Sequence, residues 1–503
     1  MTVLAHRVTA SDADDQLTRD ALAVLQPGFE GTTAPAWLLR RVGEGLTAVG
    51  LFGRNIASPE QLAALTAQLR AERDDVLVAI DEEGGDVTRL EVRGGSSFPG
   101  NLALGAVDDT ALTRDVAREL GRRLAECGVN LNWAPSADVN SNPDNPVIGV
   151  RSFGADTHLA ARHTAAYVEG LQAAGVAACT KHFPGHGDTN VDSHHALPRI
   201  DVDLDTLVAR ELVPFKAAIA AGTKAVMSAH ILVPALDPTR PATLSPQILT
   251  GLLRKELGYE GLIVTDGMEM NAIAGTYGIE RGSVLAIAAG ADAICVGGGL
   301  ADEATVLRLR DALVAAVRDG ALPAERLADA AARVRALAAW TRHARAAAAP
   351  GAPQEGSAPG IGLAAARRAL VVSGTAAPVS AAPYVATLAP VANIAVGDET
   401  PWGVAAELAA LVPGTGSGVF PEGATATDIL AAAGGRTVVA VVRDAHRHPW
   451  MAQALDGLVA ARPDTVVVEM GVPQAAPRGA LHIATHGASR VCGAAAAEII
   501  AGA

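Results

Sequence analysis

One stretch of the sequence concentrates side chains that can carry protons: KHFPGHGDTNVDSHH, residues 181–195, with four histidines and two aspartates. A loop with several glycines has no packing reason to hold so many titratable groups. Asp192 and His194 lie two residues apart, so the carboxylate can bind one imidazole nitrogen and raise the basicity of the other. An imidazole with an ordinary pKa near ~6.5 can donate and retrieve a proton at neutral pH. The spacing predicts a proton shuttle.

Two other interpretations of this histidine loop stay open. Histidine and aspartate at short spacing can bind zinc, although no HExxH or CxxC element accompanies them. The histidines can also be solvated loop residues without a chemical role.

A second candidate for chemistry is Asp266, in the stretch IVTDGMEM. It directly follows an apolar run, and the neighbouring Gly267 lets a substrate approach with little hindrance. Aspartate is also a common helix N-cap. Taken alone, the residue does not decide between a nucleophile and a cap.

The elements that must position these residues are short apolar runs with helical patterns between them. Runs without polar alternation are typical of strands buried on both faces. We predict strands at Leu22–Leu25, Ala48–Phe52, Val76–Ile80, Val129–Trp133, Val176–Thr180, Ala225–Ser228, Leu262–Thr265 and Ala293–Val296. Eight βα repeats predict an α/β fold, a (β/α)₈ TIM-like barrel, which typically takes ~250 residues plus insertions.

In such a barrel, function collects at the carboxyl ends of the strands. Ionisable or amide side chains stand at or just after the predicted strands: Asp81, Asn132, Lys181, His182, His230 and Asp266. We therefore predict a catalytic or ligand site at this rim.

A change of composition divides the chain. Around residues 344–362 the sequence AAAAPGAPQEGSAPG loses all apolar periodicity, which predicts a linker. Beyond it, strand-like runs at Ala369–Ser373, Thr437–Val442 and Thr465–Met470 alternate with helical segments. We predict a catalytic domain over 1–343, a linker over 344–362, and a smaller α/β sandwich domain over 363–503.

Composition excludes several classes of protein. At 503 residues the chain is long enough for two cores. The net charge of −14 comes without clustered Lys or Arg, so we expect no nucleic-acid partner. No apolar stretch is long enough to span a membrane and the start shows no signal peptide, so we expect a cytoplasmic protein without membrane contact. The four scattered cysteines indicate reduced core residues.

The motifs together carry a family resemblance. KHFPGHGDT followed by DSH, IDEEGG with a later Arg, RSFG and TDGMEM, in this order over roughly residues 20–340, resemble the β-N-acetylglucosaminidase branch of glycoside hydrolase family 3. The resemblance implies a retaining exo-β-N-acetylglucosaminidase (a β-N-acetylhexosaminidase) acting on cell-wall- or chitin-derived saccharides, as in peptidoglycan recycling. Asp266 would attack the anomeric carbon, and His194, oriented by Asp192, would serve as acid/base in place of the usual second carboxyl group.

The resemblance also implies the sugar-binding residues: Asp81, Arg89, Arg151, Lys181 and His182. Asp81 can accept hydrogen bonds from adjacent hydroxyls, and Arg or Lys can donate to hydroxyl and acetamido oxygens. A structural ion pair remains the alternative role for Arg151. We expect a small saccharide as the partner, no metal or other cofactor, and a monomer or homodimer.

Two positions depart from the family pattern. Asp86 stands where many relatives carry a basic residue, which predicts altered contacts beyond the cleaved sugar. Gly267 stands where relatives often have Asp or Ala, which should leave the nucleophile in place. Gly297–Gly299 fits either a phosphate site or a tight turn. Acidic and histidine residues of the second domain are assigned no catalytic role: Asp444, His446, His448 and Glu469.

Two rival reactions fit the same residues. Phosphate can replace water as the acceptor, because a neutral imidazole does not repel phosphate as a second carboxylate would. A β-glucosidase or β-xylosidase is the other alternative, against which the complete Asp192/His194 dyad argues. A non-catalytic sugar sensor would lack one of the three catalytic candidates, and all three are present.

Overall fold

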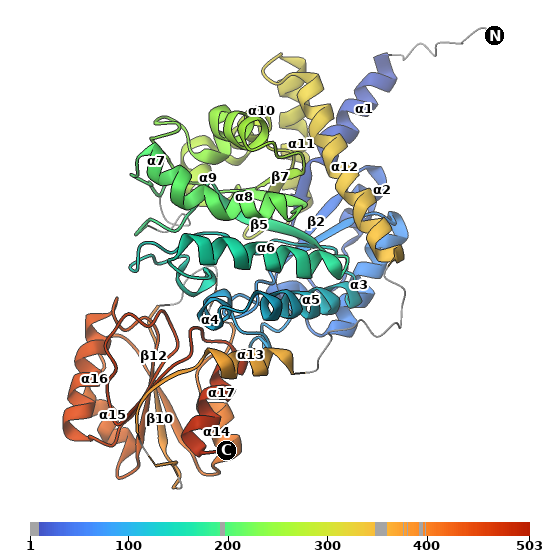
Figure 1. Cartoon of the computed structure of the whole chain (residues 1–503). Helices are drawn as coiled ribbons and strands as arrows, with labels where there is room; N and C mark the ends of the chain where they lie inside the picture. The colour runs from blue at the N-terminus through green and yellow to red at the C-terminus, as the bar shows by residue number, and fades with distance from the viewer. Residues whose placement is uncertain are drawn as a thin grey trace.

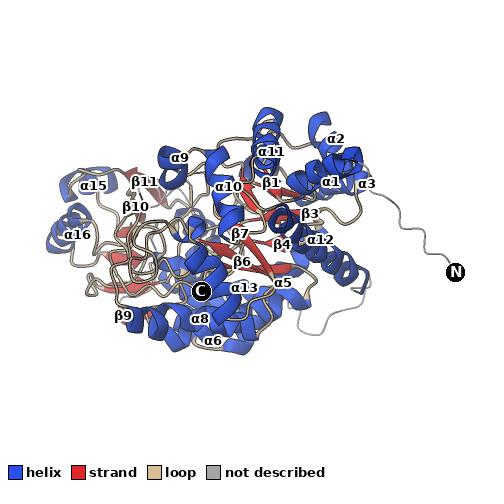
Figure 2. Cartoon of the chain, turned by 90° about the horizontal axis from the view of Figure 1, so that it is seen from above, coloured by secondary structure: helices blue, strands red, loops and turns tan. Residues whose placement is uncertain are grey.

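Two six-stranded sheets organise the described chain, one in each domain, and a two-stranded pair accompanies the first (Figure 1). The computed structural model describes residues 10–191, 197–347, 360–375, 377–379, 381–391, 396–397 and 399–503. Figure 2 shows the strands of the first sheet enclosed by helices, with the second sheet to one side.

The first sheet is parallel throughout and follows the order of the chain. Its six strands are β2 (Ala48–Leu51), β3 (Leu77–Ile80), β4 (Leu131–Asn132), β5 (Ala177–Phe183), β6 (Ala225–Ser228) and β7 (Leu262–Thr265). A separate pair joins β1 (Leu25–Pro27) to β8 (Ile294–Val296), and a single bridge between Val264 and Ala293 connects this pair to β7. Every residue of these strands is buried, as their continuous apolar runs predicted.

The expected α/β architecture, a curled parallel sheet followed by a second domain, is confirmed. A closed eight-stranded barrel stays a prediction, because no ladder joins β1 to β2 within the described chain. The first strand was predicted too early. Leu22 and Ala23 end helix α1 (Ala10–Ala23), and β1 begins at Leu25. Residues 21–25 are all buried, so apolar content alone could not separate the helix end from the strand.

Helices cover the outside of the first sheet. The longer ones are α2 (Ala36–Glu44), α3 (Pro59–Glu72), α5 (Thr110–Glu126), α6 (Thr157–Ala173), α8 (Leu212–Ala220), α10 (Ile279–Ala289), α11 (Glu303–Arg318) and α12 (Ala324–Ala347). Shorter ones are α4 (Asn101–Val107), α7 (Leu204–Thr206) and α9 (Asn271–Tyr277). The 3₁₀ helices are η1 (Gly53–Asn55), η2 (Gly149–Arg151) and η4 (Ala242–Leu244). The π-helical segments are η3 (Leu207–Glu211) and η5 (Gln247–Glu256). Their apolar faces and the strands form one large core.

The second sheet has six strands in the order β11-β10-β12-β13-β14-β9, with only β9 antiparallel. The strands are β9 (Val371–Gly374), β10 (Tyr384–Leu388), β11 (Gly416–Phe420), β12 (Val438–Val442), β13 (Val466–Glu469) and β14 (Leu481–Ala484). Helices α13 (Ile361–Ala369), α14 (Ala405–Leu411), α15 (Ala426–Ala433), α16 (Pro449–Ala461) and α17 (Arg490–Ala501) flank it. Ala369 ends α13, so the predicted strand start there is wrong. Helix α12 runs four residues into the expected linker, whose residues 348–359 lie outside the described part of the chain.

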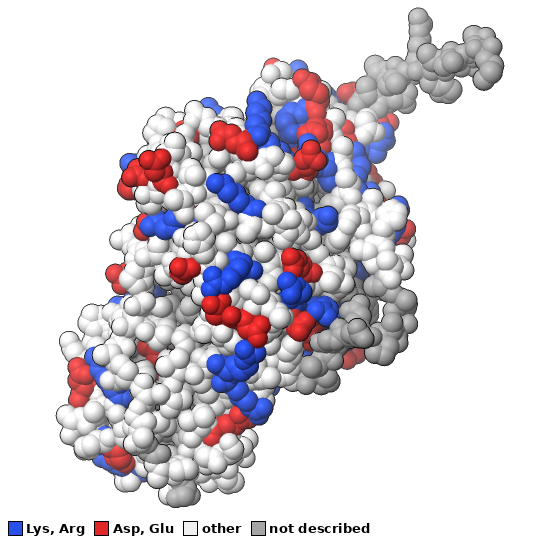
Figure 3. All heavy atoms as spheres, in the orientation of Figure 1, with Lys and Arg blue, Asp and Glu red and all other residues white. Residues whose placement is uncertain are grey.

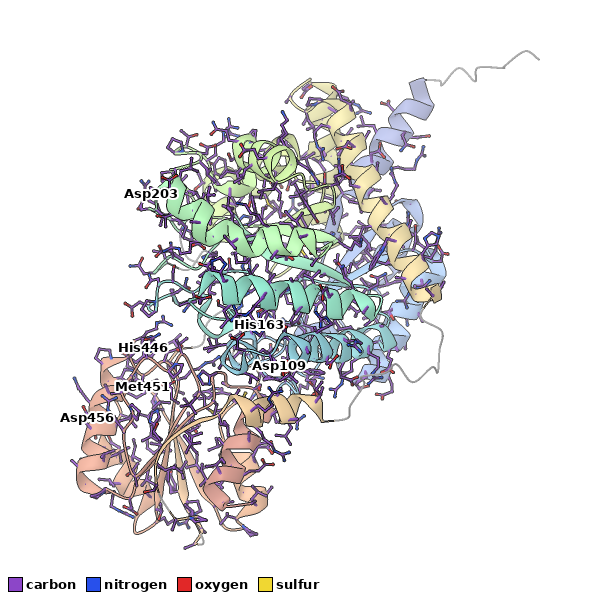
Figure 4. The ribbon with its side chains drawn as sticks, viewed as in Figure 1. Asp109, His163, Asp203, His446, Met451 and Asp456 are labelled. Carbon is purple, nitrogen blue, oxygen red and sulfur yellow. The ribbon has the colours of Figure 1, made fainter. Side chains whose placement is uncertain are left out.

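The two domains meet along α13 and the loops above it. Helix α13 packs on α4, and a Cβ added to Gly362 would lie 1.9 Å from the Ser97 carbonyl oxygen, so only glycine permits this approach. Arg368 pairs with Asp109 at 3.0 Å, and His446 Nε2 lies 2.9 Å from the Pro143 carbonyl oxygen. Figure 4 shows Asp109 and His446 on the facing sides of the two domains.

Asp86 forms the most buried ion pair of this junction. Its side chain is 1% exposed, pairs with Arg443 of the second domain, and accepts the Ala488 backbone N–H at 2.7 Å. A cavity opens at the carboxyl ends of the strands of the first sheet, and Asp86 is not among the described residues that line it. The expectation that Asp86 alters contacts beyond the cleaved sugar is therefore wrong: its charge is used to join the domains.

The surface shows no dominant charge on the face drawn in Figure 3, where acidic and basic side chains are interspersed. Within the described residues, no helix combines the length and apolar character that crossing a membrane requires.

We expect Asp86→Ala to lower the free energy of unfolding in urea by about 3 kcal/mol, because the change leaves the Arg443 charge without its buried partner. Asp456→Ala is the matched control. Asp456 is 65% exposed and pairs with Arg478 at 2.8 Å, so its loss should stay below about 1 kcal/mol. Equal losses in the two variants would contradict the role given to Asp86.

Candidate active site

A cavity of about 640 Å³ opens at the carboxyl ends of the strands of the first sheet. Six of the eight predicted site residues line it: Asp81, Arg89, Arg151, Lys181, His182 and Asp266. The structure therefore brings together side chains that are up to 185 positions apart in the sequence (266 − 81). The other two predicted residues, Asp192 and His194, lie outside the described residues, so their placement stays a prediction.

Four charged side chains interlock in the wall of this cavity. Lys181 Nζ lies 2.6 Å from Asp81 Oδ1 and 2.7 Å from Glu83 Oε1. Arg151 binds both oxygens of Glu83, with Nη2–Oε1 at 2.7 Å and Nε–Oε2 at 3.0 Å. Two carboxylates and two cations thus balance one another, which a buried group of charges requires.

Glu83 and Lys181 are each held in the ionised form by the charges around them. Burial alone would raise the pKa of Glu83, but Arg151 and Lys181 outweigh it and hold that pKa well below its ordinary value. Burial alone would lower the pKa of Lys181, but Asp81 and Glu83 outweigh it and raise that pKa. Lys181 therefore stays protonated and fixes Asp81, whose side chain is still 24% exposed, at the cavity wall.

Arg151 has the bonds of a structural ion pair. Its side chain is only 6% exposed, and besides Glu83 it donates from Nη1 to the Val147 carbonyl oxygen at 3.2 Å. This was the alternative to a sugar-binding role. The side chain nevertheless lines the cavity, so both roles remain compatible with its position.

Arg89 is placed by its neighbour Glu82. The buried Glu82 carboxylate accepts the backbone N–H groups of Arg89 and Leu90, each at 2.8 Å. The Asn132 amide in turn bonds both the N–H and the carbonyl of Glu82. Burial raises the pKa of Glu82 to about 7. Glu82 and Asn132 thus hold the loop after β3 in place, and Arg89 of that loop reaches the cavity.

His182 is oriented by a fully buried carboxylate. Its Nδ1 lies 2.7 Å from Asp138 Oδ2, and Asp138 also accepts the His186 backbone N–H at 2.7 Å and the Ser136 hydroxyl at 2.9 Å. Burial would raise the pKa of Asp138, but the nearby imidazole of His182 and the other donors lower it to about 2. An ionised Asp138 accepts a proton-bearing Nδ1, which fixes the tautomer of a neutral His182.

Asp266 follows β7 directly and is partly buried. Its Oδ1 accepts the Gly267 backbone N–H at 2.8 Å, and His230 Nε2 bonds the Gly267 carbonyl oxygen at 3.0 Å. Helix α9 begins only at Asn271, with Met270 as its N-cap. The N-cap interpretation of Asp266 is therefore wrong. His230, which the sequence places at the rim, therefore holds the backbone next to Asp266 through its bond to the Gly267 carbonyl oxygen.

The histidine loop is anchored on both sides of the part that is not described. Before it, Asn145 Nδ2 donates to the carbonyl oxygens of His186 and Gly187, and Arg210 binds Asp188 at 2.5 Å. After it, the Ile200 backbone N–H bonds the Leu232 carbonyl oxygen at 2.9 Å. Because His186 itself lines the cavity, the loop starts from the cavity wall.

Several lining or positioning residues were not predicted: Glu83, Asp138, Arg54, Glu269 and, from the second domain, Val396, Gly397 and Glu399. Glu83 carried a signal, because it stands two residues after Asp81 in IDEEGG. Asp138 lies a few residues after the fourth strand, at the strand ends where site residues are expected to collect. Nothing local marked Glu399, since its place depends on how the second domain meets the first.

A metal centre was the open alternative for the histidine loop. Across the described ranges, no group of three or more His, Cys, Asp or Glu side chains is arranged to hold a metal ion. His194, His195 and Asp192 lie outside these ranges, so the expectation of no metal stays a prediction. All four cysteines are buried and free, as expected of reduced core residues.

Residues 38–337 match the family model described as the glycosyl hydrolase family 3 N-terminal domain. The chain belongs to glycosyl hydrolase family 3. The family expected from the motifs is therefore confirmed. Membership makes the chain a glycoside hydrolase, the enzyme class that the motifs predict.

Similar proteins are known from several bacteria. β-Hexosaminidase A of Pseudoalteromonas piscicida is 38% identical over 312 residues, which cover 57% of this chain and 52% of that protein, so the match spans about half of that relative. β-Hexosaminidase of Neisseria gonorrhoeae is 36% identical over 265 residues, covering 51% of this chain and 73% of that protein. The solved family 3 β-N-acetylglucosaminidase from Paenibacillus sp. str. FPU-7 is 35% identical with a TM-score of 0.84, covering 97% of this chain and 96% of that one.

We expect Glu83→Gln to lower the free energy of unfolding at pH 7 by about 3–5 kcal/mol, because Arg151 and Lys181 then lose a buried counter-charge. The folded-state pKa of Glu83 is depressed, so its contribution is present above the ordinary pKa of 4.5 and is lost as the pH falls below it. The gap between wild type and variant should therefore shrink below about pH 4.5 in urea titrations at a series of pH values.

Glu280→Gln is the control for this change, because Glu280 is 41% exposed and pairs with Arg308 at 3.0 Å. Its effect should stay below about 1 kcal/mol. A Glu83→Gln loss that is equally small, or that grows toward acid pH, would contradict the role of the cluster.

Proposed function

We propose that this chain is a retaining exo-β-N-acetylglucosaminidase that releases N-acetylglucosamine from the non-reducing end of cell-wall- or chitin-derived saccharides, with water as the acceptor. The supporting observation is that Asp266 shares one cavity with the Asp81–Lys181–Glu83–Arg151 cluster. The likeness to the Paenibacillus enzyme over both domains points to the same substrate class. Action in the cytoplasm and a closed (β/α)₈ barrel belong to the same proposal.

The proposed reaction has two steps. The Asp266 carboxylate attacks the anomeric carbon and forms an ester while the glycosidic oxygen leaves with a proton from His194. Water then attacks the same carbon, gives its proton to His194 and releases Asp266. Asp192 accepts a proton-bearing nitrogen of His194 and orients the ring, so the acid and the base are one imidazole.

The ion cluster suits the recognition of a sugar. Asp81 keeps an exposed edge and, as a carboxylate, accepts hydrogen bonds from hydroxyl groups. Arg89 and Lys181 can donate to hydroxyl or acetamido oxygens from the same wall, and His182 Nε2 can accept a hydrogen bond from a sugar hydroxyl. Because these groups are held by buried partners, the site needs little rearrangement when the sugar binds.

Among the described residues of the second domain, Glu399 is the acidic side chain that could rival His194 as acid/base. Glu399 reaches the cavity, whereas Asp444, His446, His448 and Glu469 are absent from its described lining. Glu469 is used internally: it accepts the backbone N–H groups of Asp444, Ala445 and Gly471. Within the described part of the second domain, Glu399 is therefore the candidate for a β-glucosidase-like acid/base.

We expect Asp266→Ala to lose nearly all turnover of an aryl β-N-acetylglucosaminide, because the change removes the carboxylate proposed to form the ester. Added azide should act as an external nucleophile. Steady-state kcat/KM measures the effect. Retention of more than about a tenth of wild-type kcat/KM, a loss under ~1.4 kcal/mol, would show that Asp266 is not the nucleophile.

The dyad is tested by varying the leaving group. His194→Ala should slow cleavage of a natural disaccharide more than cleavage of an aryl glycoside with a good leaving group, which needs little protonation. Asp192→Asn should act in the same direction, and the two changes should be strongly non-additive. Glu399→Gln serves as the comparison. If the leaving-group dependence follows Glu399→Gln instead, the acid/base belongs to the second domain.

A further inference from the structure

The glycine turn after β8, Gly297–Gly299, carries an internal anion. Glu269 Oε1 accepts the Gly297 backbone N–H at 2.9 Å and also the Gly298 backbone N–H. Backbone N–H groups of such turns are the donors that bind phosphate at this end of many barrels. The sequence left a phosphate site and a tight turn as alternatives. In the structure, a carboxylate of the chain itself takes the two donors.

Two glycines make room for this carboxylate. A Cβ added to Gly298 would lie 2.8 Å from Glu269 Oε1, and one added to Gly267 would lie 3.3 Å from Glu269 Oε2. Glu269 therefore sits between the glycine turn and the residue that follows Asp266. Gly267 departs from the family pattern, and its lack of a side chain leaves room for the Glu269 carboxylate.

The Glu269 carboxylate also lies at the cavity wall, where its opposite charge is that of Arg54. It lines the cavity with Asp266, and its Oε2 is buried with no hydrogen-bond partner among the described residues. Arg54 attracts the Glu269 charge but makes its hydrogen bonds elsewhere: it donates to the carbonyl oxygens of Gly297 and Gly298 and pairs with Glu30 at 3.1 Å. An anion entering beside Asp266 would meet a like charge at short range.

We propose that Glu269 is a specificity-determining residue that selects water over phosphate as the acceptor, because it occupies the anion-binding N–H groups of the glycine turn and places a negative charge beside Asp266. The proposal rests on the function proposed above and concerns its second step. If phosphate entered, one of its oxygens would attack the anomeric carbon and break the ester to Asp266. The product would be a glycosyl phosphate in place of the free sugar.

The test compares wild type with Glu269→Ala and Glu269→Gln in two readouts. Calorimetric titration with inorganic phosphate measures binding without any turnover. Product analysis with an aryl β-N-acetylglucosaminide, in phosphate and in phosphate-free buffer of equal ionic strength, measures the acceptor. Glu30→Gln is the matched control, since it removes a carboxylate that contacts Arg54 but leaves the glycine turn occupied.

We expect Glu269→Ala to bind phosphate at least tenfold more tightly than wild type and to form glycosyl phosphate. Glu269→Gln should change less, because its amide oxygen can still accept the two N–H groups, and Glu30→Gln should resemble wild type. Wild-type formation of glycosyl phosphate at the rate of Glu269→Ala, or equal phosphate binding by both, would overturn the proposal. The calorimetric titration compares phosphate binding by wild type and variants even if no variant turns over substrate. A wild-type protein that does not hydrolyse the glycoside would contradict the proposed function itself.

Discussion

The buried contact of Lys181 with Asp81 and Glu83 is the constraint on which the site depends. Lys181 comes from β5, and the two carboxylates come from the end of β3, so the contact ties together strands separated by β4. Arg151, from η2, completes the balance by binding Glu83. None of these charges could be buried alone. The cluster therefore requires the strand ends to meet, and the folded sheet in turn keeps Glu83 and Lys181 ionised.

Much of the first domain could be predicted because burial on both faces leaves a clear signal. Runs such as Leu262–Thr265 are apolar throughout, and the structure has the strand with the same bounds. The rim residues followed from strand ends alone. Glu83 and Asp138 were missed because they contact other side chains and not a predicted ligand, so only the folded arrangement shows their use.

The second domain was harder to predict, for physical reasons. Strand β11 (Gly416–Phe420) is an edge strand in which two exposed positions alternate with three half-buried ones, and glycine supplies two of its five residues. Neither its composition nor its pattern is typical of a buried strand. Asp86 was misassigned for a related reason: its partner Arg443 lies 357 positions away, and no local pattern reports such a contact. The loop with Asp192 and His194 stays a prediction.

The domains are linked in chemistry as well as in packing. The Asp86–Arg443 pair, α13 and His446 hold the second domain against the first, and Glu399 then contributes to the cavity wall. We propose that the histidine loop of the first domain supplies the acid/base. On this account the second domain shapes the cavity, and the charges of Asp266 and Glu269 decide what reacts in it.

The central claim is that Asp266 forms a covalent bond to the sugar. The direct measurement is to incubate the enzyme with a 5-fluoro N-acetylglucosaminyl fluoride, whose ester turns over slowly because fluorine disfavours the cationic transition state, and to map the adduct by peptide mass spectrometry. We expect one sugar residue on the peptide that contains Asp266. An adduct on another carboxylate, such as Asp81 or Glu269, or inactivation without any adduct, would contradict it.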